Sequence, residues 1–501
     1  MSAQTIPDRA RRAASGARAV ALGQACRFLL QLAGLTALAR LLTPADFGLV
    51  AMVTAVVGIG EVLRDFGLSS AAIQARQLSR QQRDNLFWLN AGIGAALALG
   101  LVVCAPLVQS FYGQDGLSSV VMMLAPAVLL NALSTQYRAG LTRDLRFTAL
   151  AVSDVVAQAV AVAVAVTVAL TRGDYLALVG QQLALALAGL VMLAVWSRWV
   201  PGLPRRADGT SRLVRFGGNV AATQLLGYLS RNVDTLVIGR AFGEAAVGLY
   251  GRAFQLLMLP LSQINGPATS VALPVLSRSQ DDPADFRRMI LRSQTVLLTL
   301  VLAAISLLFT TAPLVVATFL GDQWDAVVPV MRVLCLGGAF QAAGYVSYWC
   351  FVALGRTGSH LRFTLVSRPL LVGAVVVGSA GGVLGVAGAY GLGVMVVWFG
   401  GLWWLRAEAA VPTRQMLTDG LVLVTVFGVS AGVGAGVSTS SGQSGLVAAA
   451  ALGVGAQLLT LAVAYLTVRR FRASARATTE FVRLAVRRPP RPKSPRRTDD
   501  G

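Results

Sequence analysis

Long apolar runs occupy most of this chain and restrict the folds that it can adopt. A helix needs about 20 apolar residues to cross the hydrocarbon core of a bilayer. Fourteen runs reach that length, at about 18–41, 47–73, 85–110, 117–139, 148–170, 175–197, 213–239, 246–274, 291–312, 326–354, 363–380, 384–406, 417–437 and 445–468. They are rich in Ala and Leu and lack the alternation typical of membrane β-barrels. The sequence therefore predicts an all-α integral membrane protein with about fourteen transmembrane helices.

Charge is scarce, and most of it lies outside the apolar runs. Charged residues make up 13% of the chain, against roughly 25% in soluble domains. The net charge of +21 comes from arginines in short loops and in the C-terminal tail, whereas a nucleic-acid-binding domain gathers them on one folded face. The four cysteines lie inside apolar runs, with no spacing that indicates a disulfide framework or a metal site. We expect no nucleic-acid partner and no metal.

Arginines recur in alternate loops, which predicts the orientation of the helices. Loops rich in Arg face the cytoplasm, and such loops precede the first helix and follow every second helix thereafter. The basic segment 1–17 has no clear cleavage site after it, so the first apolar run is interpreted as a retained helix. Both termini are predicted to be cytoplasmic.

The chain contains two similar halves. Arg40, Gly48 and Leu49 recur as Arg240, Gly248 and Leu249, and LRFT at 145–148 is repeated at 361–364. The offset of about 200 residues covers six helices, an even number, so the halves share one orientation. The predicted domains are a cytoplasmic N-terminus (1–17), an N-lobe (18–199), a cytoplasmic linker (200–212), a C-lobe (213–406), two extra helices (407–468) and a basic, disordered cytoplasmic tail (469–501).

Several polar residues fall in the middle of predicted helices, where an ionisable side chain usually faces a cavity or a partner. Arg27 has amides one turn away on the same face. Arg231 and Asp234 are one turn apart and can pair, which leaves a structural ion pair as an alternative interpretation. The candidate site residues are Gln24, Arg27, Gln31, Asp65, Asn219, Arg231, Asp234, Arg252, Gln255 and Asn265. Asp65 lies near a helix end, where solvation is the alternative.

Several segments resemble the Wzx-type polysaccharide flippases of the multidrug/oligosaccharidyl-lipid/polysaccharide (MOP) exporter superfamily. They are ARLLTPADFGL at 39–49, DFGL at 65–68 with AIQ at 72–74, DTLVIG at 234–239, residues 248–250, and LPVLS at 273–277. The resemblance covers about 15–470 and implies a V-shaped, MATE-like transporter with two six-helix lobes and two extra helices. It implies export of an undecaprenyl-diphosphate-linked oligosaccharide across the bacterial inner membrane by alternating access. Polysaccharide polymerase and glycosyltransferases are expected partners, besides membrane lipids.

A flippase must bind the diphosphate and the sugar of its substrate inside the membrane, and this requirement predicts roles for the candidate residues. Arginine forks bind phosphate oxygens, and amides bind sugar hydroxyls. We hypothesise that Arg27, Arg231 and Arg252 bind the diphosphate. The sugar would meet Gln24, Gln31, Asn219, Gln255 and Asn265. Asp234 or Asp65 would couple H⁺ or Na⁺ to the return step; no other cofactor is expected.

Alternative functions remain open from the sequence. A lipid II-type flippase of the same superfamily fits the same pattern. A cation-coupled drug antiporter would have an acidic cavity, whereas the deep charges here are mainly positive. A scaffold of a glycan-synthesis complex could be recruited through the Arg-rich tail. No Walker motif or nucleophile elbow occurs, so nothing argues for an enzyme.

Overall fold

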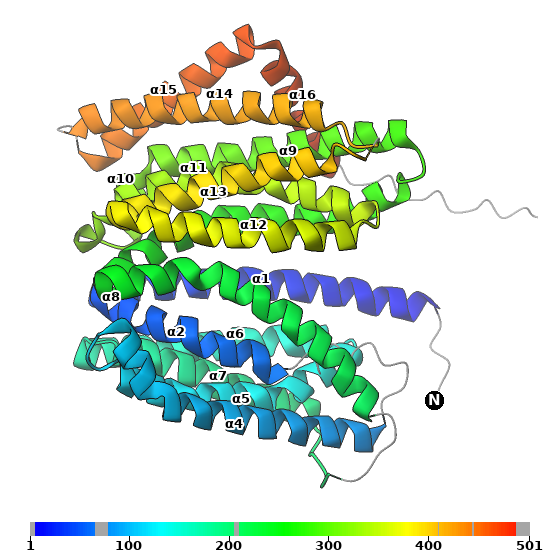
Figure 1. Cartoon of the computed structure of the whole chain (residues 1–501), viewed down its shortest axis with the longest axis vertical. Helices are drawn as coiled ribbons and strands as arrows, with labels where there is room; N and C mark the ends of the chain where they lie inside the picture. Colours follow the sequence, from blue (N-terminus) through cyan, green and yellow to red (C-terminus); the bar gives the residue numbers. More distant parts are fainter. Residues whose placement is uncertain (1–5, 66–78, 205–209, 409, 443–444, 487–501) are drawn as a thin grey trace, which may run out of the picture. The chain divides into compact units, whose positions relative to one another are not determined.

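The computed structural model describes residues 6–65, 79–204, 210–408, 410–442 and 445–486, and all regular elements in these ranges are helices (Figure 1). They are α1 (Ile6–Leu41), α2 (Pro44–Asp65), α4 (Arg80–Tyr112), α5 (Leu117–Arg143), α6 (Phe147–Arg172), α7 (Leu176–Ser197), α8 (Thr210–Arg278), α9 (Pro283–Thr310), α10 (Ala312–Phe319), α11 (Val327–Ala353), α12 (Thr357–Gly378), α13 (Gly382–Leu405), α14 (Thr413–Ser440), α15 (Leu446–Thr467) and α16 (Arg469–Val486), with short 3₁₀ turns η1 (Asp322–Trp324) and η2 (Ser379–Gly381).

Each predicted run corresponds to a helix, or to one part of α8. Gly243 interrupts α8 with φ 81° and ψ −174°, a conformation that side chains other than glycine resist, so its two parts match the seventh and eighth predicted helices. Within the described residues, eleven segments are long and apolar enough to cross a membrane, and one of them contains both α12 and α13. The prediction of an all-α membrane protein is confirmed.

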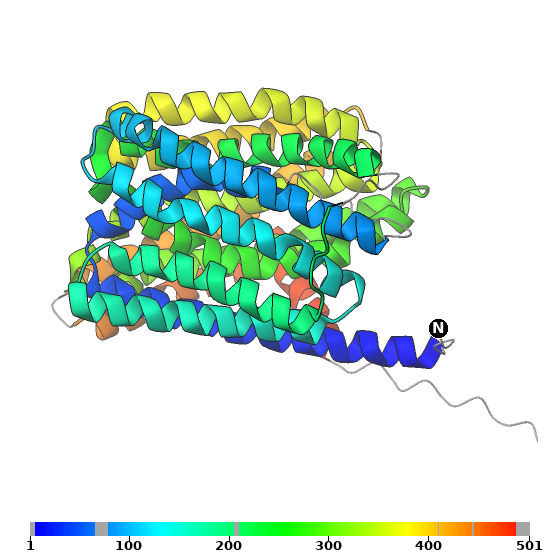
Figure 2. The same ribbon diagram turned by 90° about the horizontal axis from the view of Figure 1, so that it is seen from below.

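Local signals in the sequence explain where helices begin and end. Ser79 caps α4 in a capping box with Gln82, and the left-handed Gly113 (φ 68°) ends that helix. Asp282 caps α9 and is followed by Pro283 in the first turn, where a proline costs no hydrogen bond. The basic start of α1 extends past the neighbouring helices of its unit (Figure 2).

The described helices form two compact units. Unit 1 contains Met1–Gln255, Val315–Met331 and Arg368–Tyr390, and unit 2 contains the remaining segments. In unit 1, α6 packs on α7 and α1, and α4 packs on α5. In unit 2, α14 packs on α15 and α9. The predicted N-lobe, 18–199, lies wholly in unit 1, while the boundaries of the two lobes stay predictions.

The tail differs from its prediction. The sequence predicted disorder from Arg469 onward, but residues 469–486 form α16, which packs against α9, α15 and α14. Phe471, Ser474 and Thr478 are buried at helical spacing along one face. This buried face explains why the segment is ordered although it is rich in arginine.

Two glycines related by the repeat meet inside unit 1. A Cβ atom added to Gly48 in α2 would lie 1.6 Å from the carbonyl oxygen of Glu244, and one added to Gly248 in α8 would lie 1.9 Å from the carbonyl oxygen of Pro44. The contact is nearly reciprocal. Gly48 leaves space for Glu244, four residues before Gly248, and Gly248 leaves space for Pro44, four residues before Gly48. The backbones of α2 and α8 therefore touch where only glycine fits.

The end of α1 is fixed beside this glycine contact. The Gln323 side chain donates to the carbonyl oxygens of Ala39 (2.6 Å) and Leu42 (3.1 Å), and Trp324 Nε1 donates to Ala39 (2.8 Å). Arg40 donates to the Thr318 carbonyl at 2.8 Å. These bonds satisfy carbonyls that a helix C-terminus leaves without partners.

Candidate substrate-binding site

Arg252 lies on α8 one turn beyond Gly248, and aromatic and amide groups hold it. Its guanidinium carbon lies 4.0 Å from the centre of the Phe47 ring, a cation–π geometry. Its Nη1 donates to Oε1 of Gln255. None of the ion pairs among the described residues involves Arg252. Arg252 and Gln255, two of the candidate site residues, are therefore in contact, and within the described part of the chain no carboxylate pairs with Arg252.

The Phe47 ring is held in place by Trp324. Phe47 is buried and its ring meets that of Trp324 edge to face, with centroids 5.4 Å apart. Arg252 therefore lies against a platform that joins α2 to η1, close to the glycine contact.

Arg27 lies on α1 and faces a carboxylate of α6. Its Nη1 is 4.0 Å from Asp154 Oδ2, and its side chain is 42% exposed. Asp154 forms a closer, bidentate ion pair with Arg138 of α5. Arg138 Nη2 donates to Oδ1 at 2.5 Å, and Nη1 donates to Oδ2 at 3.3 Å. No carboxylate lies within one turn of Arg27 along α1, and the carboxylate that it faces comes from α6. Two guanidinium groups share one carboxylate, so the cluster keeps a positive charge.

Arg231 and Asp234 do not pair, although their spacing allows it. The Arg231 side chain is exposed, whereas Asp234 is buried at 8% exposure. Asp234 Oδ1 instead accepts from the Thr235 N–H at 2.8 Å. Tyr250 of the same unit lies beside the carboxylate. The structural ion pair considered from the sequence is not formed, because the Arg231 side chain runs back along α8 toward Gly227, where its Nη1 would lie 3.3 Å from an added Cβ.

The remaining predicted residues are placed as follows. Gln24 and Gln31 are exposed on α1. Asn265 lies in unit 2, partly buried, and its Oδ1 has no hydrogen-bond partner among the described atoms. The side chains of Asp65 and Asn219 lie outside the described residues. The structure thus brings Arg252 and Gln255 into contact and places Arg27 beside Asp154.

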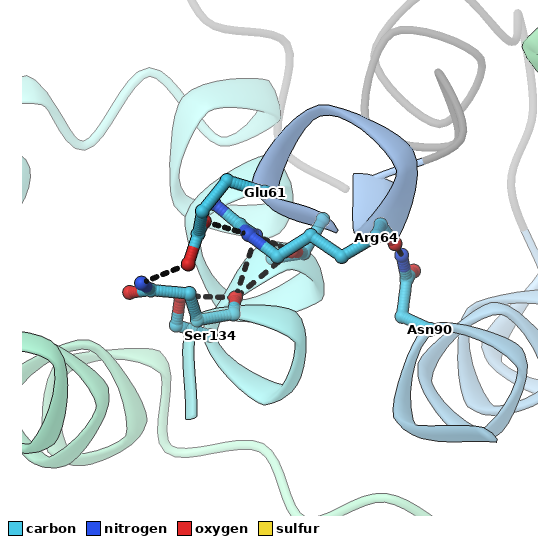
Figure 3. Close-up of polar contacts among 6 residues, drawn as sticks. Glu61, Arg64, Asn90 and Ser134 are labelled. Atoms are coloured by element: carbon cyan, nitrogen blue, oxygen red, sulfur yellow. Dashed lines mark hydrogen bonds and ion pairs between the residues drawn. The ribbon is translucent and has the colours of Figure 1, made fainter. Parts of the chain in front are cut away.

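A charged network that the sequence did not predict lies at the end of α2 (Figure 3). The side chains of Glu61 and Arg64 bond each other, and both reach Asn131 of α5: Asn131 Nδ2 donates to Glu61 at 2.8 Å, and Arg64 Nη1 donates to the Asn131 carbonyl at 2.8 Å. Arg64 also donates to Thr135 (2.9 Å), and Asn90 of α4 donates to the Arg64 carbonyl (2.9 Å). The charged groups of Glu61 and Arg64 are therefore held by α5 and by each other instead of by solvent alone.

The fold defines the class of protein. The chain aligns with the structure of the lipid II flippase MurJ in an inward closed conformation at a TM-score of 0.69 with 12% identity, covering 89% of this chain and 98% of that one. An inward-facing multidrug resistance MATE transporter of the MOP superfamily aligns at 0.60 with 18% identity, covering 76% and 94%. The chain therefore shares the fold of these two transporters, as predicted.

The family model for polysaccharide biosynthesis proteins matches residues 37–329, and the chain belongs to this family. It is 24% identical over 388 residues to the lipopolysaccharide biosynthesis protein WzxC of Escherichia coli (strain K12), covering 76% of this chain and 78% of WzxC. It is 25% identical over 410 residues to the teichuronic acid biosynthesis protein TuaB of Bacillus subtilis (strain 168), covering 80% and 83%. The resemblance to Wzx-type members of the MOP superfamily is confirmed.

Proposed function

We propose that this protein is a flippase, not an enzyme, which moves an undecaprenyl-diphosphate-linked oligosaccharide from the cytoplasmic to the outer leaflet of the inner membrane by alternating access. One observation carries the proposal: guanidinium groups within the helical spans outnumber the carboxylates near them. Arg252 has no ion-pair partner among the described residues, and Arg27 shares Asp154 with Arg138. Such charge is costly in hydrocarbon unless it serves an anion.

The diphosphate is the part of the substrate that needs these arginines. Arg27, Arg231 and Arg252 bind it, since a guanidinium presents a planar fork of donors to phosphate oxygens. Arg252 is the best prepared of the three, because Phe47 and Gln255 hold its side chain in one orientation before substrate arrives. Preorganisation lowers the entropic cost of binding.

The sugar units are bound by neutral polar side chains. Gln24 and Gln31 flank Arg27 on α1 and are exposed, so their amides are accessible. Gln255, Asn219 and Asn265 complete the set. The Asn265 Oδ1 atom is a buried acceptor without a hydrogen-bond partner among the described atoms, and a sugar hydroxyl would supply the missing donor.

Asp234 couples an ion to the return step, and Asp65 is the second candidate. A buried carboxylate without a cationic partner either takes up a proton or binds a cation. Asp234 is buried, and it takes part in none of the ion pairs formed by the described residues. Export itself is favoured by the membrane potential, because two negative charges moving outward across about 100 mV release roughly 4.6 kcal/mol.

Both termini lie in the cytoplasm, as the alternating Arg-rich loops require. The two lobes, 18–199 and 213–406, exchange access to the two leaflets. The relatives named for lipopolysaccharide and teichuronic acid biosynthesis support a glycan substrate. Glycosyltransferases that complete the lipid-linked oligosaccharide and a polymerase that consumes it are the natural partners.

Reconstitution tests the proposal. Vesicles containing the full chain are loaded with a fluorescent undecaprenyl-diphosphate oligosaccharide, and its transfer between leaflets is followed with a membrane-impermeant quencher. We expect transfer that falls at least tenfold in Arg252→Gln, since a charge-assisted contact contributes about 1.5–3 kcal/mol. Arg172→Gln, at the exposed end of α6, is the matched control and should transfer normally.

Parallel vesicles with lipid II or with a fluorescent organic cation identify the competing functions. Faster transfer of lipid II would assign a peptidoglycan precursor, and cation efflux would assign a drug antiporter. No transfer of any substrate by a folded protein would leave a scaffold role and overturn the proposal.

A further inference from the structure

A cavity beneath α16 in unit 2 lies apart from every residue assigned above. It has a volume of about 700 Å³ and is lined by parts of α9, α14 and α16. Three arginines, Arg292, Arg414 and Arg470, come one from each helix. Asp419 is the single acidic residue of the lining. The excess of positive charge points to an anionic ligand.

The three arginines differ in how far they are already neutralised. Arg470 bonds Asp419 at 3.3 Å, and Arg292 reaches Glu480 only at 3.8 Å. Arg414 takes part in none of the ion pairs of the described residues. It lies in the first turn of α14, where the helix dipole also favours an anion. Arg414 is therefore the guanidinium most available to a ligand.

The helix α16, which forms one wall of the open cavity, packs against its neighbours. Phe471 of α16 meets Phe427 of α14 edge to face, with ring centroids 5.7 Å apart. Arg472 donates to the carbonyls of Tyr465, at 2.9 Å, and Leu466 at the end of α15. These contacts hold α16 across the ends of the neighbouring helices, so the cavity is a formed site.

The surroundings favour an amphiphilic ligand. Leu459, Val463 and Leu466 are exposed on α15, the membrane-spanning helix that leads directly into α16. A phospholipid could place its acyl chains along such a surface while its headgroup meets arginines at the boundary of the bilayer. Gln415 and Thr295 add an amide and a hydroxyl to the lining, groups suited to the glycerol or phosphate oxygens of a headgroup.

We propose that this cavity binds the phosphate of an anionic phospholipid headgroup, and that Arg414 and Arg470 are its principal ligands. Bound lipid would fasten α16 to α9 and α14, independently of the transported substrate. The proposal does not depend on the flippase function.

Native mass spectrometry of the purified full chain tests it with phosphatidylglycerol as the probe. We expect Arg414→Gln to weaken binding roughly tenfold, because one charge-assisted contact is lost. Arg476→Gln, on the exposed side of the same α16, removes an equal charge and should leave binding within twofold. Equal losses in both variants would mean diffuse surface attraction and would overturn the proposal.

A variant that is expected to bind the lipid more tightly excludes misfolding as the cause of weaker binding. Asp419→Asn removes the acidic group that competes for Arg470 and should tighten phosphatidylglycerol binding severalfold, which no damaged protein would do. Inorganic phosphate added at equal concentration distinguishes the source of the ligand. Displacement of the lipid by inorganic phosphate would assign the cavity to a soluble phosphate compound and contradict the lipid assignment.

Discussion

The two ends of α2 are held by different kinds of contact, a backbone contact at one end and polar side chains at the other. At Gly48 its backbone touches the backbone of α8, with no side chain from either glycine in between. At Glu61 and Arg64 it is joined to α4 and α5 by charged and amide side chains (Figure 3). The first contact joins segments related by the repeat, and the second ties α2 to helices of its own half.

This difference indicates which contact can separate during transport. A backbone contact between glycines rests on dispersion and weak Cα–H···O attraction, so it exposes no unpaired charge when it opens. Opening the Glu61–Arg64 network would leave charged groups without partners, at a cost of several kcal/mol. We therefore expect α2 to move with α4 and α5 and to part from α8 at Gly48.

The largest effect is expected from Gly48→Val. A Cβ atom there would overlap the Glu244 carbonyl at 1.6 Å, so α2 and α8 cannot approach and flipping should be abolished. Transfer of the fluorescent substrate in vesicles measures this. Gly251→Ala is the matched control, because nothing lies within 4 Å of its added Cβ. Normal transfer by Gly48→Val would remove the glycine contact from the mechanism.

Substitutions in the Glu61–Arg64 network should lower the free energy of unfolding. Replacing Glu61 by Gln or Arg64 by Gln each leaves a partner unsatisfied, at a cost of about 2 kcal/mol for side chains that are 28% exposed (Glu61) and 22% exposed (Arg64). Denaturant titration in mixed micelles gives the free energies of unfolding. In the double variant the costs should be clearly less than additive. Additive costs would show that the two residues act separately.

A smaller effect is expected from Phe47→Leu beside the glycine contact. The change removes the ring under Arg252 and should weaken substrate binding by about 1–2 kcal/mol, while Arg252 keeps its bond to Gln255. Binding of undecaprenyl diphosphate by wild type and variant in detergent is the measurement. Unchanged binding would mean that the ring does not orient Arg252.

The smallest effect is expected from Tyr228→Phe in the first part of α8. The Tyr228 hydroxyl contacts the carbonyls of Thr54 and Ala55 in α2, at 3.1 and 3.2 Å. Losing the hydroxyl should lower the free energy of unfolding by about 1 kcal/mol with little change in transport. A large loss of transport would show that α2 and α8 also depend on polar contacts here.

Helix positions could be predicted from the sequence because bilayer thickness fixes the length of an apolar run. The short α10 and η1 were not predicted, since they lack that length, and α16 was missed because its arginines obscured the helical spacing of Phe471, Ser474 and Thr478. Within the site, Arg252 and Gln255 lie three residues apart on one helix, so their contact could be predicted from the spacing. The Arg27–Asp154 and Arg252–Phe47 contacts join different helices, and spacing along the chain carries no information about them.

The most direct test of the account measures the affinity of the full chain for undecaprenyl diphosphate without sugar, using calorimetry in detergent. If arginines hold the diphosphate, Arg252→Gln should bind at least tenfold more weakly than wild type, and Arg172→Gln should bind equally well. Equal affinities of wild type and a folded Arg252→Gln variant would contradict the central claim that uncompensated guanidinium groups in the spans receive the diphosphate.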